Sequence, residues 1–140
     1  DWYDMSPEIE LQAIAAVPNS GFFSNLAVRA EANALIDLCI AKNGSYRALT
    51  TDAGVQGNSI KTTWLNTNFT GARAAAGIDF ATNFNKGPYG GPNKLLIDDR
   101  TTYINQFEAA GGKGFKYYES GGILKFGGDR ASVGPVTLLA

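Results

Sequence analysis

Two kinds of apolar pattern alternate along this chain. Short apolar runs have the length of buried strands, and they lie at 46–50, 78–81, 95–98 and 115–118. Longer segments, in which apolar residues recur every three or four positions, have the spacing of helices and lie at 30–41, 58–65 and 101–110. Polar segments between them predict loops at 51–57 and 83–93. Because alternating strands and helices build parallel sheets with crossover helices, the pattern predicts an α/β fold.

Residues that begin and end helices agree with these segments. Asn58 is a residue type that caps helices, and we expect it to begin the second helical segment. Gly44 follows the first segment and a Gly-Gly pair follows the third, at 111–112, where glycine commonly ends a helix. Ser6 and Pro7 predict one further helix near the start of the chain.

The pattern changes after Ser120. Glycine pairs and a Gly-Pro step separate two short apolar pieces, 123–126 and 136–139. We therefore expect a hairpin or a terminal arm in this region. The predicted organisation is an α/β domain at 1–120 and this hairpin or arm at 121–140.

Composition and charge narrow the class of protein. A chain of 140 residues that is 44% hydrophobic is expected to fold around one small core. Its net charge of −1 predicts no nucleic-acid partner, and no apolar run approaches the ~20 residues that span a bilayer. The absence of histidine excludes His-based hydrolase triads and His-ligated zinc. Cys39, the single cysteine, lies in an apolar helical pattern, which predicts a core position and fits a reducing compartment.

The most informative segment is the apolar run at 95–98 with the acids that end it. Asp98 and Asp99 follow the apolar residues directly, and a helical segment follows the acids. We expect an interior parallel strand, and open α/β sheets place their chemistry at the carboxyl end of such strands. Two adjacent carboxylates repel each other unless a cation neutralises them, and Mg²⁺ prefers carboxylate oxygens as ligands. The alternative is that Asp99 only caps the following helix.

Four more polar residues lie at predicted strand ends or helix starts. Thr50 and Thr51 end the first strand, where hydroxyls and free amides can hold a phosphate. Lys61 follows in the next helix, where its ammonium can neutralise the same phosphate, and Lys86 precedes the acidic strand. Each residue also has an ordinary, non-functional interpretation. The threonines are common residues at the end of a strand, and the lysines can be charged side chains in contact with solvent. Their order and spacing favour a site.

In this order, these residues resemble a known family. They are similar to the motifs of the haloacid dehalogenase (HAD) superfamily, in particular its 5′(3′)-deoxyribonucleotidase branch with phage and bacterial members; the similar residues are Thr50-Thr51, Lys61, Trp64-Leu65, Lys86 and 95–100. The segments 21–26 and 107–112 also resemble parts of that branch. The resemblance implies a Rossmann-like, HAD-type parallel sheet with crossover helices.

The resemblance also implies a role for each residue of the site. Thr50 and Thr51 would bind the oxygens of the transferring phosphoryl group, and Lys61 would balance charge on a phosphoaspartyl intermediate. Asp99 would hold Mg²⁺, with Asp98 beside it.

Three further residues would bind the substrate, a nucleotide or another phosphate. Phe22 and Phe23 would line a nucleobase pocket, because aromatic rings stack on any base. Packing in the core explains these two phenylalanines equally well. Lys86 would contact the substrate from the loop before the acidic strand.

The sequence departs from this family in one respect that bears on catalysis. HAD enzymes begin with a strand ending in Asp-x-Asp, and its first Asp attacks phosphorus; these 140 residues contain no Asp-x-Asp. Without a nucleophile, the remaining groups can position phosphate but cannot perform the first chemical step. The missing strand would also be the central strand of the sheet, so we expect another protein chain to complete it.

Three explanations of this departure stay open. The chain is a fragment of a longer enzyme, one piece of a split protein, or a domain recruited for binding or structure, for example in a phage particle. We expect it to be inactive alone; the alternative is an active Mg²⁺-dependent deoxyribonucleotide phosphohydrolase once a partner or upstream segment supplies the Asp. The expected location is a bacterial or phage-infected cytoplasm, or a virion. Fold alone does not decide between these functions.

Overall fold

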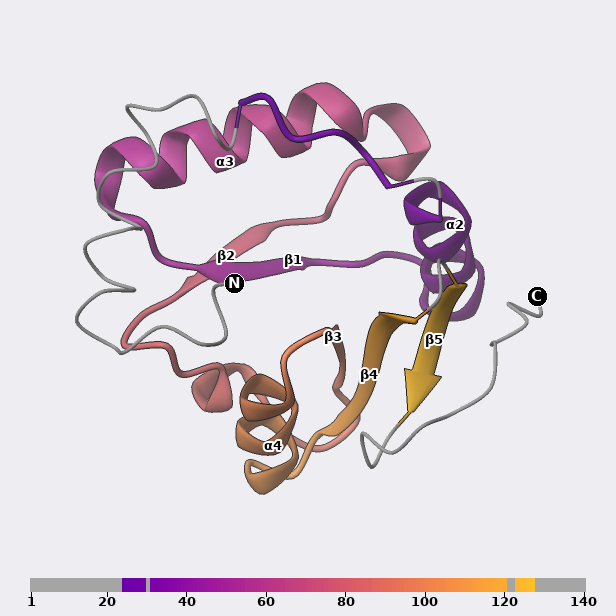
Figure 1. Cartoon of the computed structure of the whole chain (residues 1–140), viewed down its shortest axis with the longest axis vertical. Coiled ribbons are helices and arrows are strands. Elements are labelled where there is room, and N and C mark those ends of the chain that lie inside the picture. The colour runs from indigo at the N-terminus through magenta and orange to yellow at the C-terminus, as the bar shows by residue number, and fades with distance from the viewer. Residues whose placement is uncertain (1–23, 30, 121–122, 128–140) are drawn as a thin grey trace. The chain divides into compact units, whose positions relative to one another are not determined.

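The computed structural model describes residues 24–29, 31–120 and 123–127 (Figure 1). Its elements, in chain order, are α2 (Ala32–Asn43), β1 (Ala48–Thr51), α3 (Gly54–Asn68), η2 (Gly71–Arg73), β2 (Ile78–Ala81), η3 (Gly87–Tyr89), β3 (Leu95–Asp98), α4 (Thr101–Ala109), β4 (Lys113–Ser120) and β5 (Ile123–Gly127). They confirm a mixed α/β class. The chain forms two compact units, one ending at Phe80 and the other beginning at Ala81. The division at residue 120 stays a prediction.

The first unit contains a two-stranded sheet of β1 and β2. Figure 1 shows α3 running along these two strands. The helix α2 ends at Gly44, which has a φ of +88° and donates its N–H to the carbonyl oxygen of Ile40 at 2.7 Å. Glycine adopts this left-handed conformation without the steric cost of a Cβ, so the predicted helix stop is confirmed.

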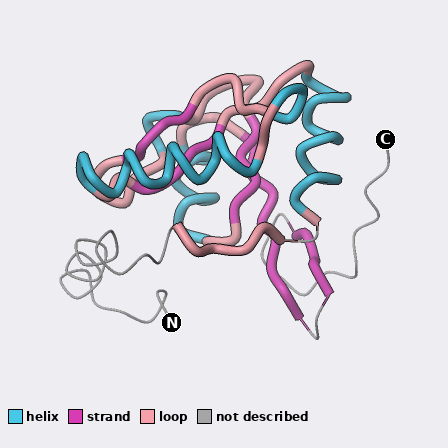
Figure 2. The backbone as a smooth tube through the Cα atoms, turned by 90° about the horizontal axis from the view of Figure 1, so that it is seen from above, coloured by secondary structure: helices cyan, strands magenta, loops and turns pink. Residues whose placement is uncertain are grey.

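The second unit contains a three-stranded sheet in the order β3-β4-β5. The strands β3 and β4 are parallel and are connected by α4, and Leu95 pairs with Lys113 while Asp98 pairs with Lys116. The strands β4 and β5 form an antiparallel hairpin, visible as two neighbouring magenta strands in Figure 2. The predicted parallel crossover is therefore confirmed. The observed hairpin joins β5 to β4, whereas a hairpin or arm within 121–140 stays a prediction. The predicted helix after Ser6 and the apolar piece at 136–139 lie outside the described residues.

The buried core of the second unit lies beneath α4. Tyr103, Ile104 and Phe107 are all buried there, as their helical spacing predicts. On β4, Gly114 allows a close approach, because a Cβ added to it would lie 2.6 Å from Cγ2 of Ile104. Interiors packed this closely respond to a single added methyl group, so helix and strand are held in one arrangement.

The predicted start of α3 is wrong. The segment 51–57 was expected to be a loop that Asn58 closes as a helix cap, but α3 already begins at Gly54. Asn58 therefore lies inside the helix, and its Oδ1 accepts a hydrogen bond from the backbone N–H of Ala53 at 2.8 Å. A capping side chain can reach back along the helix, so its position does not mark the first helical residue.

The predicted interior position of β3 is not seen among the described strands and stays a prediction. Among the described strands, β3 pairs only with β4, so it is the edge of its sheet, and the described strands form two sheets instead of one. Leu96 is buried while Leu95 is 52% exposed. The apolar run thus has one covered face, which α4 packs against, and one open face. A continuous run of apolar residues cannot reveal which of its two faces is covered.

Candidate functional site

A buried ion pair lies at the carboxyl end of β3. Asp98 is the last residue of the strand, and its Oδ2 lies 2.5 Å from Nζ of Lys86, which comes from the loop between β2 and β3. Lys86 and Asp98 are only 5% and 8% exposed. Burial raises the pKa of the Asp98 carboxyl group, and the Lys86 ammonium opposes this shift. The Lys86 ammonium therefore favours the charged form of the Asp98 carboxyl group inside the unit.

The start of α4 adds a second contact to Asp98. Its Oδ1 accepts a hydrogen bond from the backbone N–H of Arg100 at 2.9 Å. Arg100, and not Asp99, occupies the N-cap position of α4, so the alternative role of Asp99 as the helix cap is wrong. The reason is that the chain stays extended for one residue beyond Asp99 before it turns into the helix. Asp99 is exposed beside the buried pair.

An aromatic ring completes the surroundings of Lys86. The Lys86 ammonium lies 4.5 Å from the ring centroid of Tyr103, and the Arg100 guanidinium carbon lies 5.1 Å from the same centroid. Arg100 also donates from Nη1 to the Tyr103 hydroxyl oxygen at 3.3 Å. Cations are attracted to the face of an aromatic ring, and more strongly where water is excluded. The site therefore gathers two cations around one buried tyrosine.

A second group of predicted residues comes together in the first unit. Nζ of Lys61 donates to the Thr50 hydroxyl at 3.2 Å and to the carbonyl oxygen of Thr51 at 2.5 Å. A lysine of α3 thus reaches the carboxyl end of β1. Nearby, Asn58 donates to Asp52, so polar side chains line this strand-to-helix connection.

The predicted site residues therefore form two groups. Thr50, Thr51 and Lys61 lie together in the first unit, whereas Lys86 and Asp98, with Asp99 adjacent, lie in the second. Convergence of the two groups on one pocket stays a prediction. The proposed nucleobase-binding residues at 22–23 lie outside the described residues.

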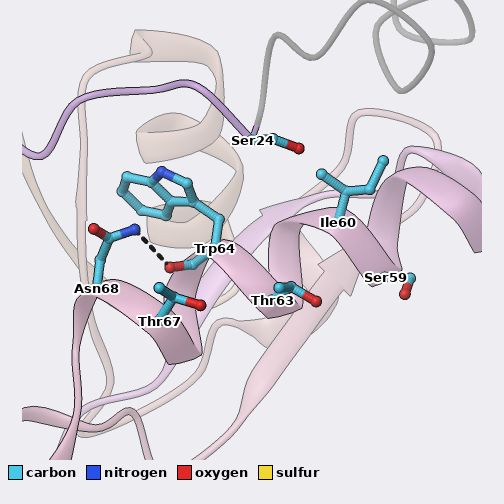
Figure 3. Close-up of a pocket in the computed structure, with 7 residues that line it drawn as sticks. All are labelled: Ser24, Ser59, Ile60, Thr63, Trp64, Thr67 and Asn68. Atoms are coloured by element: carbon cyan, nitrogen blue, oxygen red, sulfur yellow. Dashed lines mark hydrogen bonds between the residues drawn. The ribbon is translucent and has the colours of Figure 1, made fainter.

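The first unit also contains an open cavity of about 220 Å³ beside α3. Figure 3 shows its lining residues: Ser24, Ser59, Ile60, Thr63, Trp64, Thr67 and Asn68. The Trp64 indole N–H donates to the carbonyl oxygen of Leu26, and the Asn68 amide donates to the carbonyl oxygen of Trp64. Ionisable side chains are absent from this lining, so the cavity offers no general acid or base for chemistry.

Sequence reasoning missed two contributors to the Lys86 site, Tyr103 and Gln106. Tyr103 was expected only as part of the apolar face of the helix. Gln106 accepts a hydrogen bond from the Lys86 N–H at 2.9 Å. The available signal is the spacing of the two residues, because positions three apart on a helix share a face.

No protein-family model, curated protein or solved structure matches this chain. Within the described part of the chain, no group of three or more His, Cys, Asp or Glu side chains is placed to hold a metal ion. The helices of that part all lack the length and hydropathy needed to cross a membrane.

Proposed function

We propose that this chain is a HAD-like domain that binds the phosphate of a nucleotide together with Mg²⁺, and that it derives from a Mg²⁺-dependent nucleotide phosphohydrolase. The observation that carries the proposal is the buried Lys86–Asp98 pair at the end of a parallel strand, with Asp99 next to it. In open α/β sheets, ligands bind at the carboxyl ends of the strands. The β3-α4-β4 crossover supports a Rossmann-like, HAD-type sheet as the proposed fold.

The two carboxylates have different roles in this proposal. Each Asp98 oxygen already has a donor, one from Lys86 and one from Arg100, so this side chain holds the site together. Asp99 is exposed and is the carboxylate that would hold Mg²⁺. Because Mg²⁺ keeps several waters and commonly takes one or two carboxylates plus substrate phosphates, a site without a third acid suits it. When bound, the ion would neutralise phosphate charge.

The first unit contains a second group of residues that suits a phosphate. The Lys61 ammonium is held at the end of β1 by Thr50 and Thr51. Hydroxyl groups and an ammonium at a strand end can bind phosphate oxygens by charge-assisted hydrogen bonds. In the HAD-like proposal, Thr50, Thr51 and Lys61 bind oxygens of the nucleotide phosphate.

The proposal predicts binding without turnover by these 140 residues alone. Phosphoryl transfer through a covalent intermediate needs a nucleophile, and the sequence contains no Asp-x-Asp segment. Asp98 is held by Lys86 and Arg100 and is not available for in-line attack. A partner chain or a further segment would supply the nucleophile; otherwise the domain acts by binding.

Titration calorimetry with thymidine 5′-monophosphate, with and without MgCl₂, tests the proposal. We expect Mg²⁺-dependent binding, and Asp99→Asn should weaken it about tenfold or more, the loss of one strong ionic contact. Glu108→Gln is the matched control, since it removes one exposed carboxylate from the same unit and should leave binding unchanged. An affinity that changes neither with MgCl₂ nor in Asp99→Asn would contradict the proposal. Hydrolysis of the nucleotide by the pure wild-type chain would also contradict it.

A further inference from the structure

The loop that carries Lys86 begins with an unfavourable backbone turn. Asn83 and Phe84 are consecutive and have φ values of +56° and +50°, in the left-handed region. Asparagine tolerates this region better than most residues, whereas a bulky side chain such as that of phenylalanine is rarely found there. Such conformations persist only where the surrounding structure holds them. Some contact must therefore stabilise this turn.

The side chain of Gln106 on α4 makes the contacts that do so. Its Nε2 donates to the carbonyl oxygen of Phe84 at 3.0 Å, and its Oε1 accepts from the backbone N–H of Lys86 at 2.9 Å. One carboxamide thus satisfies a backbone acceptor and a backbone donor on either side of Asn85. Because its amide nitrogen and its amide oxygen both form hydrogen bonds with the loop, Gln106 connects the loop to α4.

Close packing keeps the loop against the same helix. A Cβ added to Gly90 would lie 2.7 Å from the carbonyl oxygen of Phe107, and one added to Gly87 would lie 3.4 Å from that of Gln106. Only glycine fits at Gly90, since a contact below 3.0 Å with backbone cannot be relieved by a side-chain movement. The Lys86 backbone is therefore anchored to α4 both by hydrogen bonds and by contact.

The same helix also holds the other end of Lys86. Its ammonium lies 4.5 Å from the ring centroid of Tyr103, which precedes Gln106 by one helical turn, and 2.5 Å from Oδ2 of Asp98. Gln106 fixes where the lysine side chain starts, and Tyr103 with Asp98 fixes where it ends. With both ends held, the side chain has little freedom to leave the carboxyl end of β3.

We propose that Gln106 is a positioning residue, which sets the Lys86 ammonium against Asp98 by holding the turn at Asn83 and Phe84. The inference deepens the proposed function and rests on it for the purpose of the arrangement, since the Lys86–Asp98 pair there holds the phosphate-binding end of β3 together. Gln106 acts through Lys86 and does not contact the phosphate itself.

The direct test measures how exposed the Lys86 amine is to acetic anhydride, by mass spectrometry of the full chain, with Lys94 as the exposed internal reference. In the wild type, Lys86 should react far more slowly than Lys94. Gln106→Met removes both hydrogen bonds at similar size and should raise the Lys86 rate about tenfold relative to Lys94. Gln106→Glu keeps the acceptor for Lys86 N–H but loses the donor to Phe84, and should have an intermediate effect.

Two controls separate positioning from general loss of stability. Thr102→Met introduces the same residue on the exposed side of α4 and should leave Lys86 protected. Ile104→Val destabilises the core beneath α4 without touching the carboxamide, and it should leave the Lys86 to Lys94 ratio unchanged at temperatures where the variant is folded. A Gln106→Met variant with the wild-type ratio would overturn the inference, as would an equal rise in Ile104→Val.

Binding of thymidine 5′-monophosphate with Mg²⁺ to the same variants separates this inference from the proposed function. A rise in Lys86 labelling together with about tenfold weaker binding in Gln106→Met supports both. A rise in labelling in a chain whose wild type does not bind the nucleotide keeps the positioning role of Gln106 and overturns the phosphate-binding function. Unchanged labelling with weaker binding overturns the positioning role.

Discussion

Substitution of Lys86 by methionine tests the central ion pair by leaving Asp98 without its cation. At the observed 2.5 Å separation and an effective dielectric constant of about 20, the Coulomb attraction is about 7 kcal/mol. Desolvation of two side chains that are 5% and 8% exposed offsets much of this, by several kcal/mol per ion. Removing one partner leaves that desolvation uncompensated, so Lys86→Met should cost about 3–5 kcal/mol of unfolding free energy.

Urea unfolding at pH 7, followed by circular dichroism, measures this cost. The double variant Lys86→Met with Asp98→Asn removes both charges, keeps an acceptor for the Arg100 N–H, and should recover most of the loss. Arg47→Met is the exposed control: the Arg47–Asp79 pair has side chains that are 57% and 28% exposed, so its loss should cost less than about 1 kcal/mol. Equal costs for the two methionine variants would refute the reasoning.

The pH dependence of Lys86→Met gives a second check. Lys86 lowers the pKa of Asp98 and burial raises it, so removal of the lysine leaves the pKa further above its ordinary value of 3.8. A carboxyl group whose folded-state pKa is raised contributes most to stability below its unfolded pKa, and that contribution is lost as pH rises through the folded pKa. The cost of Lys86→Met should therefore shrink as pH falls from 7 towards 4. A cost that does not change with pH would identify lost packing as the cause.

Two further predictions concern packing and surface charge. Ile104 of α4 is 0% exposed, so Ile104→Ala should lower the free energy of unfolding by about 2–5 kcal/mol, measured by urea unfolding. A loss below about 1 kcal/mol would show that the core collapses around the gap. The hydrogen bond from Arg73 lowers the pKa of Asp37 below 3.8, so its stabilising effect is present above the unfolded pKa and is lost as pH falls through the folded pKa. Asp37→Asn should therefore flatten the fall in melting temperature on acidification, and an identical profile for both chains would contradict this.

Local pattern predicts several elements closely. The bounds of β2 and β3 agree with the predicted strands, and α4 differs from its predicted segment by one residue. In each of these elements, a short apolar segment lies between polar or glycine-rich segments. Such a pattern can be recognised from neighbouring residues alone. The stop at Gly44 belongs to the same class, because a left-handed residue at a helix end is a local requirement.

The pairing inside the candidate site is not a local property. Lys86 and Asp98 both stand out in the sequence, yet their contact depends on left-handed residues at Asn83 and Phe84, which are not glycine. That turn is held by Gln106, twenty residues or more away along the chain. Tertiary contacts override local preference here, so reading residues in order cannot reveal the arrangement. The edge position of β3 likewise depends on what pairs with it.

The longest side-chain contacts of the first unit join residues farther apart along the chain than those of the second unit. In the second unit, the Gln106 contact to Phe84 spans 22 positions and the Lys86–Asp98 pair spans 12. In the first unit, the contacts Arg47–Asp79, Arg73–Asp37 and Trp64–Leu26 span 32, 36 and 38 positions. Chains whose contacts join near neighbours fold faster, because less loop entropy is lost before each contact forms. The segment around α4 should therefore gain its structure first during refolding, and the first unit should follow more slowly.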